Sequence, residues 1–492
     1  MTSTTINGMN VRGHSRRWLT TAAVLFATFQ LSACLQPLDL RADATQSPGT
    51  LSSWINSESR LALTYLIDNI SPPGTAPGVV VASPSRVNPN YYYHWVRDSG
   101  LVMDTVVKLY QGATSTNERT HYFQMLSDYV SFSRGNQLTP NWSGGLGEPK
   151  FNVDGSAYNF SWGRPQNDSP GIRATALIHF ANQLINEGQI AWVQTRLYNP
   201  NQAGGTVIKE DLEYVSQHWR ESSFDLWEEV KGKHFYTKMV QRRSLIEGAD
   251  LADRLGDIGA RDWYRLQASQ LENEIRKHWD DSRGYLVATL NPEAQRPFKP
   301  SGLDVAVVLG VLHGYASDGF YGPTSDQVLK SAAKIRAAFQ NVYGINANLN
   351  VGTAIGRYPE DTYNGFTTAG EGNPWVLATN AFAELYYRAA NEWEKQGAIP
   401  LTADNILVFT QLLGHTLPGL QANISLGSQQ TQFTQILQAV RATGDSFLDR
   451  TRLHAFSNGR LSEEFNKSTG YMQGARDLTW SYASVLTALW AR

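Results

Sequence analysis

The sequence has a single cysteine, Cys34, among 492 residues, so the fold cannot depend on a disulfide bond within the chain. The ten histidines are scattered without a His-Glu-x-x-His pattern, and we expect neither a metal site nor a cofactor. Charged residues make up only 17% and the net charge is −2, which excludes the basic surface that nucleic-acid binding needs. Beyond the N-terminal region, no apolar stretch is long enough to span a membrane.

Aromatic residues, in contrast, are abundant, with 14 Trp and 22 Tyr. Sugars have apolar C–H faces that stack on aromatic rings, and hydroxyl groups that need planar polar partners. Large helical cores also contain many Trp and Tyr. Composition alone therefore leaves carbohydrate binding and core packing open as explanations.

The first 34 residues resemble a targeting segment, because Arg12, Arg16 and Arg17 precede a short apolar run that ends in small residues. We expect residues 1–34 to direct export, residues 35–50 to form a short extension, and the mature protein to be secreted. An alternative is lipid anchoring. The sequence LSAC at 31–34 resembles a bacterial lipobox, in which Cys34 would carry the lipid.

Residues 51–492 contain no linker, charge block or short repeat, which favours one large domain. Apolar residues recur at helical spacing, and the pattern predicts an all-α fold. Such a fold can be a closed toroid of helical hairpins or a layered solenoid, and periodicity does not separate the two. Helices are expected at 51–70, 98–112, 117–134, 170–187, 208–220, 235–255, 259–279, 303–314, 326–341, 374–391, 403–413, 430–442, 445–455 and 477–491.

Four long stretches between these helices are rich in Gly, Pro, Asn, Trp and Tyr: 71–97, 136–168, 343–373 and 456–476. Loops of this length in a compact domain are usually functional. In the first, the sequence YYYHWVRDSG places Arg97 beside Asp98, a donor fork and an acceptor that suit neighbouring hydroxyl groups. Asp98 can equally be the N-cap of the next helix.

Two acidic stretches lie far apart in the chain, FDLWEEV at 224–230 and LSEEFNKSTG at 461–470. Cleavage of a glycosidic bond needs one protonated and one ionised carboxyl group. Trp227 and Phe224 would desolvate a neighbouring carboxyl group and raise its pKa, so we place the proton donor in the first stretch. An acidic helix N-terminus explains either stretch equally well, and these residues alone do not choose between Glu463 and Glu464.

Nine blocks in order carry a resemblance to a known family. They are YYYHWVRDSG, GLGEPKFNVDGSAY, WGRPQND, LEYV, FDLWEE, IGRYPEDTYNG, EGNPW, LSEEFNKSTGY and ARDLTWSYA. Together they resemble the glucoamylases of glycoside hydrolase family fifteen, in particular yeast-type members without a starch-binding domain. The resemblance covers about residues 50–490.

This resemblance implies an (α/α)₆ barrel at 51–492 and an exo-acting hydrolase. The enzyme would release β-D-glucose, with inversion, from the non-reducing ends of α-1,4-glucans. The partners implied are starch, glycogen or maltooligosaccharides. We expect a monomer without an obligate protein partner. The motif positions imply that Glu228 is the general acid and Glu463 the general base. They imply substrate-binding roles for Tyr91, Trp95, Arg97, Asp98, Trp162, Glu229, Arg357 and Trp375.

Three rival functions would need different residues at the site. A phosphorylase on the same barrel would replace activated water with phosphate and would need a basic anion pocket. A non-catalytic glucan-binding protein would not need both Glu228 and Glu463. A related exo-hydrolase that prefers α-1,6 links or trehalose stays open, because the pocket beyond the first sugar decides this preference.

Overall fold

The computed structural model describes residues 49–293, 299–347 and 350–492. The expected targeting segment 1–34, its Cys34, and most of the 35–50 extension therefore lie outside the described residues. The described residues all belong to one compact unit, Asp43–Arg492. No helix in the described ranges is both long and apolar enough to cross a membrane.

Helices dominate the described residues. Fourteen α-helices are present: α1 (Leu51–Asp68), α2 (Val96–Gly112), α3 (Thr116–Leu138), α4 (Ser169–Asn186), α5 (Ile190–Arg196), α6 (Val207–His218), α7 (Phe235–Arg254), α8 (Ile258–Arg276), α9 (Ala306–Gly314), α10 (Asp326–Gln340), α11 (Val376–Gln396), α12 (Ala403–Leu413), α13 (Thr431–His454) and α14 (Thr479–Ala491).

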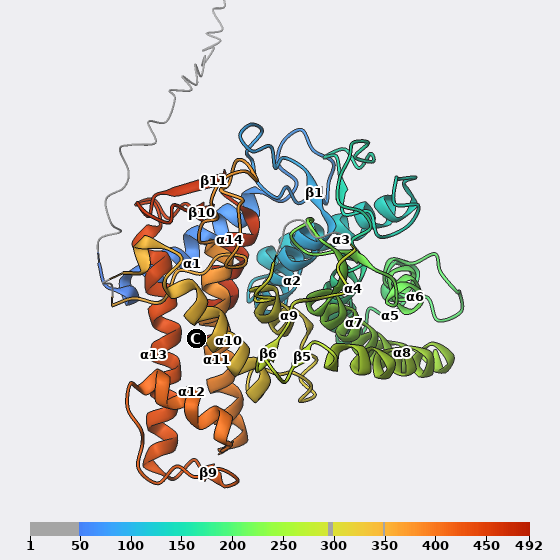
Figure 1. Ribbon diagram of the computed structural model, residues 1–492. Coiled ribbons are helices and arrows are strands. Elements are labelled where there is room, and N and C mark those ends of the chain that lie inside the picture. The colour runs from blue at the N-terminus through green and yellow to red at the C-terminus, as the bar shows by residue number, and fades with distance from the viewer. Residues whose placement is uncertain (1–48, 294–298, 348–349) are drawn as a thin grey trace, which may run out of the picture. The chain divides into compact units, whose positions relative to one another are not determined.

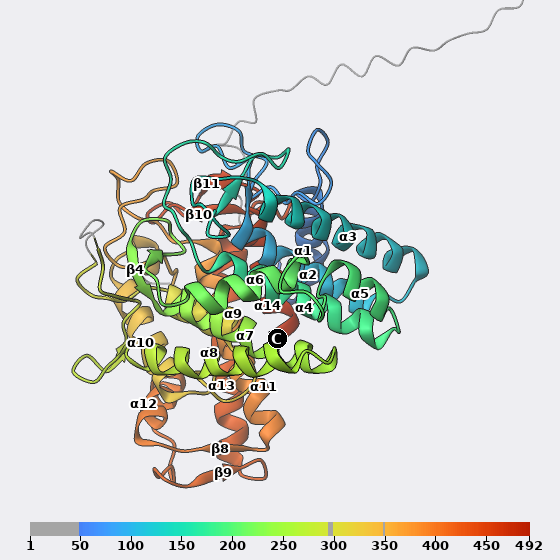
Figure 2. The ribbon, with the colours of Figure 1, turned by 90° about the vertical axis from the view of Figure 1, so that its right-hand side faces the viewer.

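Six of these helices form a closed inner ring (Figures 1 and 2). Helix α2 contacts α4, and contacts continue through α7, α9, α11 and α14, which returns to α2. Each inner helix also packs against an outer helix, the pairs being α1/α14, α2/α3, α4/α6, α7/α8, α9/α10 and α11/α13. The α14–α2 contact closes the ring, so the structure is an (α/α)₆ barrel and the solenoid alternative is wrong.

Burial separates the two rings. The inner helix α4 is buried around its whole circumference, including consecutive residues from Ser169 to Ile178. The outer helix α8 buries only Tyr264, Gln267, Ala268, Leu271 and Ile275, which lie three or four residues apart on one face. A helix that is apolar on one stripe needs one neighbour, whereas a helix covered on every side must lie inside the barrel.

The helix predictions hold with two exceptions. Segments 430–442 and 445–455 are one helix, α13, which runs through Gly444. A side chain at Gly444 would meet the ring of Tyr387 on α11 at 2.6 Å, so this glycine serves close packing between helices and does not end a helix. The short helix α5 was not predicted, because seven residues are too few to show a helical period.

Short strands occur in the segments between the helices. They are β1 (His94–Trp95), β2 (Lys150–Phe151), β3 (Ser223–Phe224), β4 (Lys231–His234), β5 (Trp279–Asp280), β6 (Tyr285–Leu286), β7 (Thr289–Leu290), β8 (Ala398–Pro400), β9 (Ser425–Gly427), β10 (Ser462–Phe465) and β11 (Met472–Arg476). A three-residue 3₁₀-helix spans Gly344–Asn346. All the strand pairs are antiparallel: β1–β2, β3–β4, β4–β7, β5–β6, β8–β9 and β10–β11.

Consecutive inner helices are separated by an outer helix, so all six run in the same direction and begin at the same end of the barrel. Strands β1, β10 and β11 lie at that end, and α12 and β9 lie at the other (Figure 1). The long loops that precede the inner helices therefore converge at one mouth of the ring, and these loops carry the acidic and aromatic stretches.

Candidate active site

The barrel contains two cavities. The larger, about 770 Å³, runs along the inner helices, from Ile172 and Trp480 near their N-terminal ends to Ala491 at a C-terminal end. Its carboxylates have partners: Asp104 contacts His179 at 2.5 Å, Glu384 pairs with Arg388, and Glu392 accepts from Tyr315 at 2.9 Å. The smaller pocket, about 310 Å³, lies at the N-terminal ends. We take the smaller pocket as the candidate site because of its carboxyl groups and aromatic rings.

All ten residues singled out from the sequence line this one pocket. They come from five segments of the chain: Tyr91, Trp95, Arg97 and Asp98; Trp162; Glu228 and Glu229; Arg357 and Trp375; and Glu463. Residues that the sequence analysis did not name also line it, among them Tyr363 and Trp480.

A tight turn presents Glu228 and Glu229. The Asp225 carboxylate accepts hydrogen bonds from the backbone N–H groups of Glu229, at 2.8 Å, and Val230, at 3.1 Å. The ammonium of Lys299 lies 3.1 Å from Asp225. Burial acts to raise the pKa of Asp225, but Lys299, His234 and the two backbone hydrogen bonds together outweigh it and hold the pKa below its usual value. FDLWEE is therefore a charged turn between β3 and β4, and the alternative of an acidic helix N-terminus is wrong here.

Glu228 has a left-handed backbone, with φ of 67°. Such a conformation costs a non-glycine residue about 1–3 kcal/mol, and it typically occurs at functional sites. The Glu228 Oε1 atom accepts from the indole of Trp95 at 2.7 Å and from the amide of Gln166 at 3.0 Å. The indole of Trp227 instead donates to Asp304. The aromatic partner of this carboxyl group thus comes from a distant loop and not from its own stretch.

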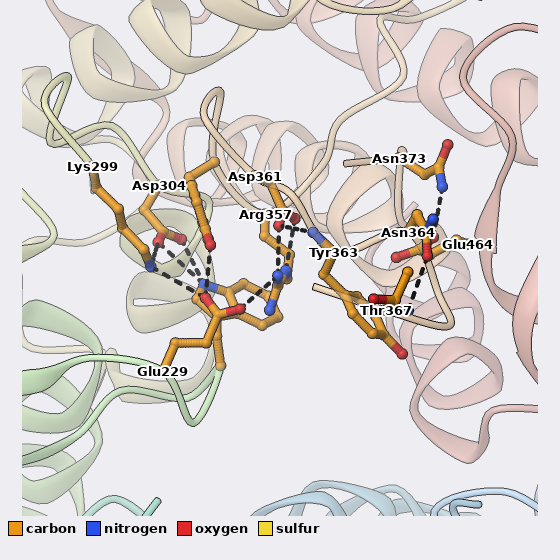
Figure 3. A network of polar contacts seen from close by, with 12 residues as sticks. Glu229, Lys299, Asp304, Arg357, Asp361, Tyr363, Asn364, Thr367, Asn373 and Glu464 are labelled. Carbon is orange, nitrogen blue, oxygen red and sulfur yellow. Dashed lines mark hydrogen bonds and ion pairs between the residues drawn. The ribbon is translucent and has the colours of Figure 1, made fainter. Parts of the chain in front are cut away.

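Glu229 joins a network of alternating charges (Figure 3). It accepts from Arg357 at 2.8 Å and from Tyr358 at 2.7 Å, and Lys299 lies 4.0 Å away. Asp361 also accepts from Arg357, at 2.6 Å from Nη2, the atom that donates to Glu229, and at 2.7 Å from Nε. Burial raises the pKa of Glu229, and Arg357 opposes that shift. The guanidinium is therefore fixed at the pocket wall with its charge balanced.

Glu463 and Glu464 lie on β10, where an irregularity in pairing with β11 falls between Ser462 and Glu464. Such bulges redirect side chains beside active sites. Glu463 lines the pocket and accepts from Tyr363 and from the backbone N–H of Ala475, both at 3.2 Å. Glu464 instead accepts from Asn373 at 2.9 Å. The stretch is a strand, so the expected alternative of a helix capped by Ser462 is wrong.

Glu463 and Glu464 are close enough for the negative charge of one carboxyl group to disfavour ionisation of the other. Burial raises the pKa of Glu463, and its hydrogen bonds oppose the shift. Burial and then the negative charge of Glu463 raise the pKa of Glu464 well above its usual range. As pH falls, Glu464 takes up a proton first, and Glu463 is the group that carries the negative charge into the pocket.

Arg97 and Asp98 lie in the first turn of α2. The N-cap is Trp95, so the alternative that Asp98 caps this helix is wrong. Arg97 donates to Gln166 at 2.8 Å and to Asp168 at 3.1 Å. Burial raises the pKa of Asp98 to about 6, although the nearby Arg97 charge lowers it. The pair thus presents the hydrogen-bond donors of a fixed guanidinium group beside a carboxyl group in the pocket.

Lys150 occupies a cage of four aromatic rings. Its ammonium lies 3.7 Å from the ring centroid of Trp162, 4.0 Å from Tyr158, 4.2 Å from Tyr93 and 4.3 Å from Trp95. Lys150 pairs with Trp95 across strands β2 and β1. Burial lowers the pKa of Lys150 from 10.5 to about 8. Two rings of this cage also line the pocket, so the lysine fixes their position.

Four buried polar atoms of residues that line the pocket have no hydrogen-bond partner in the described chain: Nε of Arg97, Nε1 of Trp162, Nε1 of Trp375 and Oε1 of Glu463. Buried polar groups normally find partners. These four atoms, three donors and one acceptor, are therefore available to a polar ligand. No group of three metal-ligating side chains occurs in the described ranges.

Sequence reasoning missed several residues that build the site, namely Lys150, Asp225, Lys299, Tyr363 and Asn373. Tyr363 links the two sides of the pocket, since its hydroxyl group contacts Glu463 at 3.2 Å and the hydroxyl group of Tyr91 at 2.9 Å. The blocks GLGEPKF and RYPEDTYNG contain Lys150 and Tyr363, but nothing local distinguishes them from residues that pack the core.

The sequence was compared with known families and proteins. The profile of the family described as Glycosyl hydrolases family 15 matches residues 61–490. The chain belongs to glycosyl hydrolase family 15. The family 15 chain is thus an enzyme, a glycoside hydrolase. It is 40% identical over 454 residues to a glucoamylase of Blastobotrys adeninivorans, an alignment that covers 90% of this chain and 72% of the relative.

Two further matches support the family 15 assignment. Glucoamylase 1 of Rhizopus oryzae is 39% identical over 445 residues, covering 90% of this chain and 71% of the relative. The solved structure of a glucoamylase from Saccharomycopsis fibuligera superposes with a TM-score of 0.82 at 32% identity. That superposition covers 91% of this chain and 96% of the other, so the barrel of this family 15 enzyme is matched over nearly its full described length.

Proposed function

We propose that this family 15 enzyme is a glucoamylase that removes β-D-glucose from the non-reducing ends of α-1,4-glucans with inversion. One observation carries the proposal. Glu228 and Glu463, which lie in loops far apart in the sequence, line the same small pocket beside the Arg97–Asp98 pair. Relatives named glucoamylase, matched over most of this chain, support the same activity.

The proposed reaction uses the two carboxyl groups in opposite states. Glu228 gives its proton to the glycosidic oxygen, and the bond between that oxygen and C1 breaks. Both hydrogen bonds to Glu228 are accepted by Oε1, which assigns the transferable proton to Oε2. Ionised Glu463 removes a proton from water, whose oxygen bonds to C1 from the opposite face. The products are β-glucose and a shortened glucan with a new hydroxyl group.

The environment of Glu463 suits a general base. Tyr363 and the Ala475 backbone donate to its Oε2, which leaves Oε1 without a partner in the described chain. Oε1 is therefore the atom that accepts the water proton. Glu464 holds a proton beneath it, so a second negative charge does not compete for that water.

The remaining pocket residues would hold the sugar. Arg97 and Asp98 would bind hydroxyl groups of the terminal glucose, because a guanidinium donates and a carboxyl group accepts in fixed directions. Trp162 and Trp375 offer stacking faces and unpartnered N–H groups. Arg357, held by Asp361, and Glu229 would orient the glucose units on either side of the cleaved bond.

The structure disfavours the phosphorylase alternative. A phosphate would need positive charge that is not already neutralised. The cations at the pocket are paired: Arg97 with Asp168 at 3.1 Å, Arg357 with Asp361 and Glu229, and Lys299 with Asp225 and Asp304 at 3.1 Å each. Water is therefore the acceptor that these surroundings favour.

Digestion of maltooligosaccharides followed by proton NMR of the first-formed product tests the proposal. We expect glucose as the only early product, in the β form, without any requirement for phosphate. The variant Glu228→Gln should lose turnover about 10³-fold while still binding maltose, because the amide cannot donate an acidic proton. First-formed α-glucose, or faster cleavage of isomaltose or trehalose than of maltose, would refute the assignment. Crystallography of this variant should place the carboxyl carbon of Glu463 about 6.5–9.5 Å from the side-chain amide carbon of residue 228.

The substrates, the domain bounds and the oligomeric state follow from the same proposal. We infer that the substrates are starch, glycogen or maltooligosaccharides, and that the catalytic domain spans 51–492 and acts as a monomer. Export by the first 34 residues, or anchoring at Cys34, stays a prediction that N-terminal sequencing and mass spectrometry of the mature protein would test.

A further inference from the structure

A buried lysine without a counter-ion lies close to the hairpin of β3 and β4. Lys238, near the start of α7, is only 4% exposed. Its ammonium forms no hydrogen bond or ion pair with any described residue, and its ring contact is with Trp219, 5.4 Å from the ring centroid. Buried charges are normally paired, because burial removes their solvation. Lys238 therefore needs a partner that the described chain does not supply.

Three further cations surround Lys238. Arg220 follows α6, Lys233 is on β4, and Lys277 follows α8, which packs against both α6 and α7 (Figure 2). Burial and then the charges of these three residues lower the pKa of Lys238 from 10.5 to about 8. Glu274 opposes this shift, but its carboxylate already pairs with Lys277 at 2.6 Å. Positive charge is thus in excess at this place.

The charges of Arg220 and Lys233 are also free of carboxylates. The Arg220 guanidinium donates to the side-chain oxygens of two glutamines, and the Lys233 ammonium donates to the backbone oxygen of Arg220. Neither residue forms an ion pair within the described ranges. The guanidinium carbon of Arg220 lies 4.0 Å from the ring centroid of Trp219, the same indole that Lys238 contacts. Two cations therefore lie beside one ring with only neutral partners.

A buried hydrogen-bond acceptor lies next to these cations. His278 is fully buried and packs on Phe235, one turn before Lys238 on α7, at 5.7 Å between ring centroids. Its Nδ1 donates to the backbone oxygen of Val287 at 2.7 Å, and its Nε2 has no partner in the described chain. Burial lowers the pKa of His278 to about 4, and the Lys238 charge adds to that shift. The ring is neutral, so Nε2 is an unused acceptor.

A ligand at this place must therefore be an anion that also carries a hydrogen-bond donor. Hydrogen phosphate meets both needs, because its charged oxygens accept from ammonium and guanidinium groups and its hydroxyl group donates. Sulfate has the same shape but no hydroxyl group at neutral pH. We propose that Lys238, Arg220, Lys233 and His278 form a binding site for a hydrogen phosphate ion. None of the four lines the candidate active-site pocket, so the ion takes no part in the reaction.

The position of the site gives the ion a structural role. Strand β3 pairs with β4, and the turn between these strands carries Glu228 and Glu229. Arg220 precedes β3, Lys233 is on β4 and Lys238 is on α7, so an ion bound to all three connects the base of the hairpin to the barrel. A ligand that binds only the folded state stabilises it by mass action. Phosphate should therefore raise thermal stability and leave catalysis unchanged.

Thermal denaturation and titration calorimetry in phosphate, sulfate or chloride at equal ionic strength test the proposal. At about ten times the Kd of phosphate, the Tm of the wild-type enzyme should exceed its Tm in chloride by about 1–2 °C. The Kd for sulfate should be at least about tenfold higher than the Kd for phosphate, because sulfate leaves Nε2 of His278 unpaired. Phosphate should change kcat/KM for maltose by less than about twofold.

Three variants make the outcome decisive. Lys238→Met should abolish the phosphate-dependent rise in Tm, while its Tm in chloride should equal or exceed that of the wild type because an unpaired buried charge is removed. Arg220→Gln, at an exposed residue, should weaken phosphate binding about five- to tenfold. The control Lys231→Met is on the same strand, but its ammonium pairs with Glu293 at 2.9 Å, so the rise in Tm should persist.

Equal Tm values of the wild type in phosphate and chloride would overturn the proposal, as would a normal rise in Tm for Lys238→Met. Equal affinities for phosphate and sulfate would also overturn it, because the assignment of hydrogen phosphate depends on the donor to His278. These measurements detect binding and stability, so their outcome does not depend on whether the enzyme releases β-glucose.

Discussion

The aromatic cage of Lys150 leads to a prediction that separates stability from activity. The change is Lys150→Met, which keeps the length and apolar stem of the side chain and removes its charge. The ammonium lies within 4.3 Å of four ring centroids. Desolvated cation–π contacts are worth about 2 kcal/mol or more, and they favour the charged form.

Burial acts against that charge. It lowers the pKa of Lys150 from 10.5 to about 8, which corresponds to roughly 3 kcal/mol against the protonated form. The cage and the desolvation cost therefore nearly offset each other. We expect Lys150→Met to change the free energy of unfolding by no more than about 1 kcal/mol in either direction.

Activity should fall far more than stability. Trp95, whose N–H donates to Glu228 at 2.7 Å, and Trp162 would no longer be held by a shared cation. Displacement of such groups by about 1 Å can cost about 10²-fold. We therefore expect kcat/KM for maltose to fall about 10- to 100-fold, with most of the loss in kcat.

The assay combines maltose hydrolysis with thermal denaturation of the same preparation. Lys330→Met is the matched control, since its ammonium lies 5.5 Å from the ring of Trp279, outside the pocket. Wild-type kcat/KM in the variant, or a stability loss above about 3 kcal/mol, would refute the reasoning.

Two further predictions concern buried charges. Burial and the charge of Glu463 raise the pKa of Glu464, so we expect it to hold a proton in the working enzyme and Glu464→Gln to remove no charge. We expect kcat/KM to stay within about threefold of wild type, and the acidic limb of the pH profile to move by no more than about half a pH unit. A shift of that limb by more than about one pH unit would show that Glu464 carries charge. In the larger cavity, burial acts to lower the pKa of His179, but Asp104 and Glu247 outweigh it and raise the pKa from 6.5 to about 9. Its stabilising contribution is then complete below pH 6.5 and is lost as pH rises through 9. The difference in unfolding free energy between wild type and His179→Gln should therefore be at most roughly 3 kcal/mol at pH 6 and should vanish by about pH 10 in denaturation experiments. A difference that does not vary with pH would contradict it, and His218→Gln is the exposed control.

Much of the fold can be read from the sequence, because helix formation depends on local information. Apolar spacing located thirteen of the fourteen described helices, although one was divided at Gly444. The pattern reports which face of a helix is apolar, but it does not report which helices face each other. Ring closure through α14 and α2 depends on contacts between the two ends of the domain, so only the structure showed it.

The site shows the same division. The residue types that bind and cleave sugars were recognisable in their motifs, and all ten chosen residues line one pocket. The motifs did not show the left-handed backbone of Glu228, the carboxylate of Asp225 that holds its turn, or the irregular strand that sends Glu463 into the pocket and Glu464 behind it. Adjacent identical residues have the same local sequence signal, and only the strand geometry distinguishes them.

By itself the sequence determined the helices and the chemical groups supplied by each loop, because both depend on residue type and local spacing. Only the tertiary structure decided which groups meet. Trp95 and Glu228, or Lys150 and its four rings, come from loops that approach each other solely because six inner helices begin at one end of the barrel. The environment of each carboxyl group, and hence its role, is set by those long-range contacts.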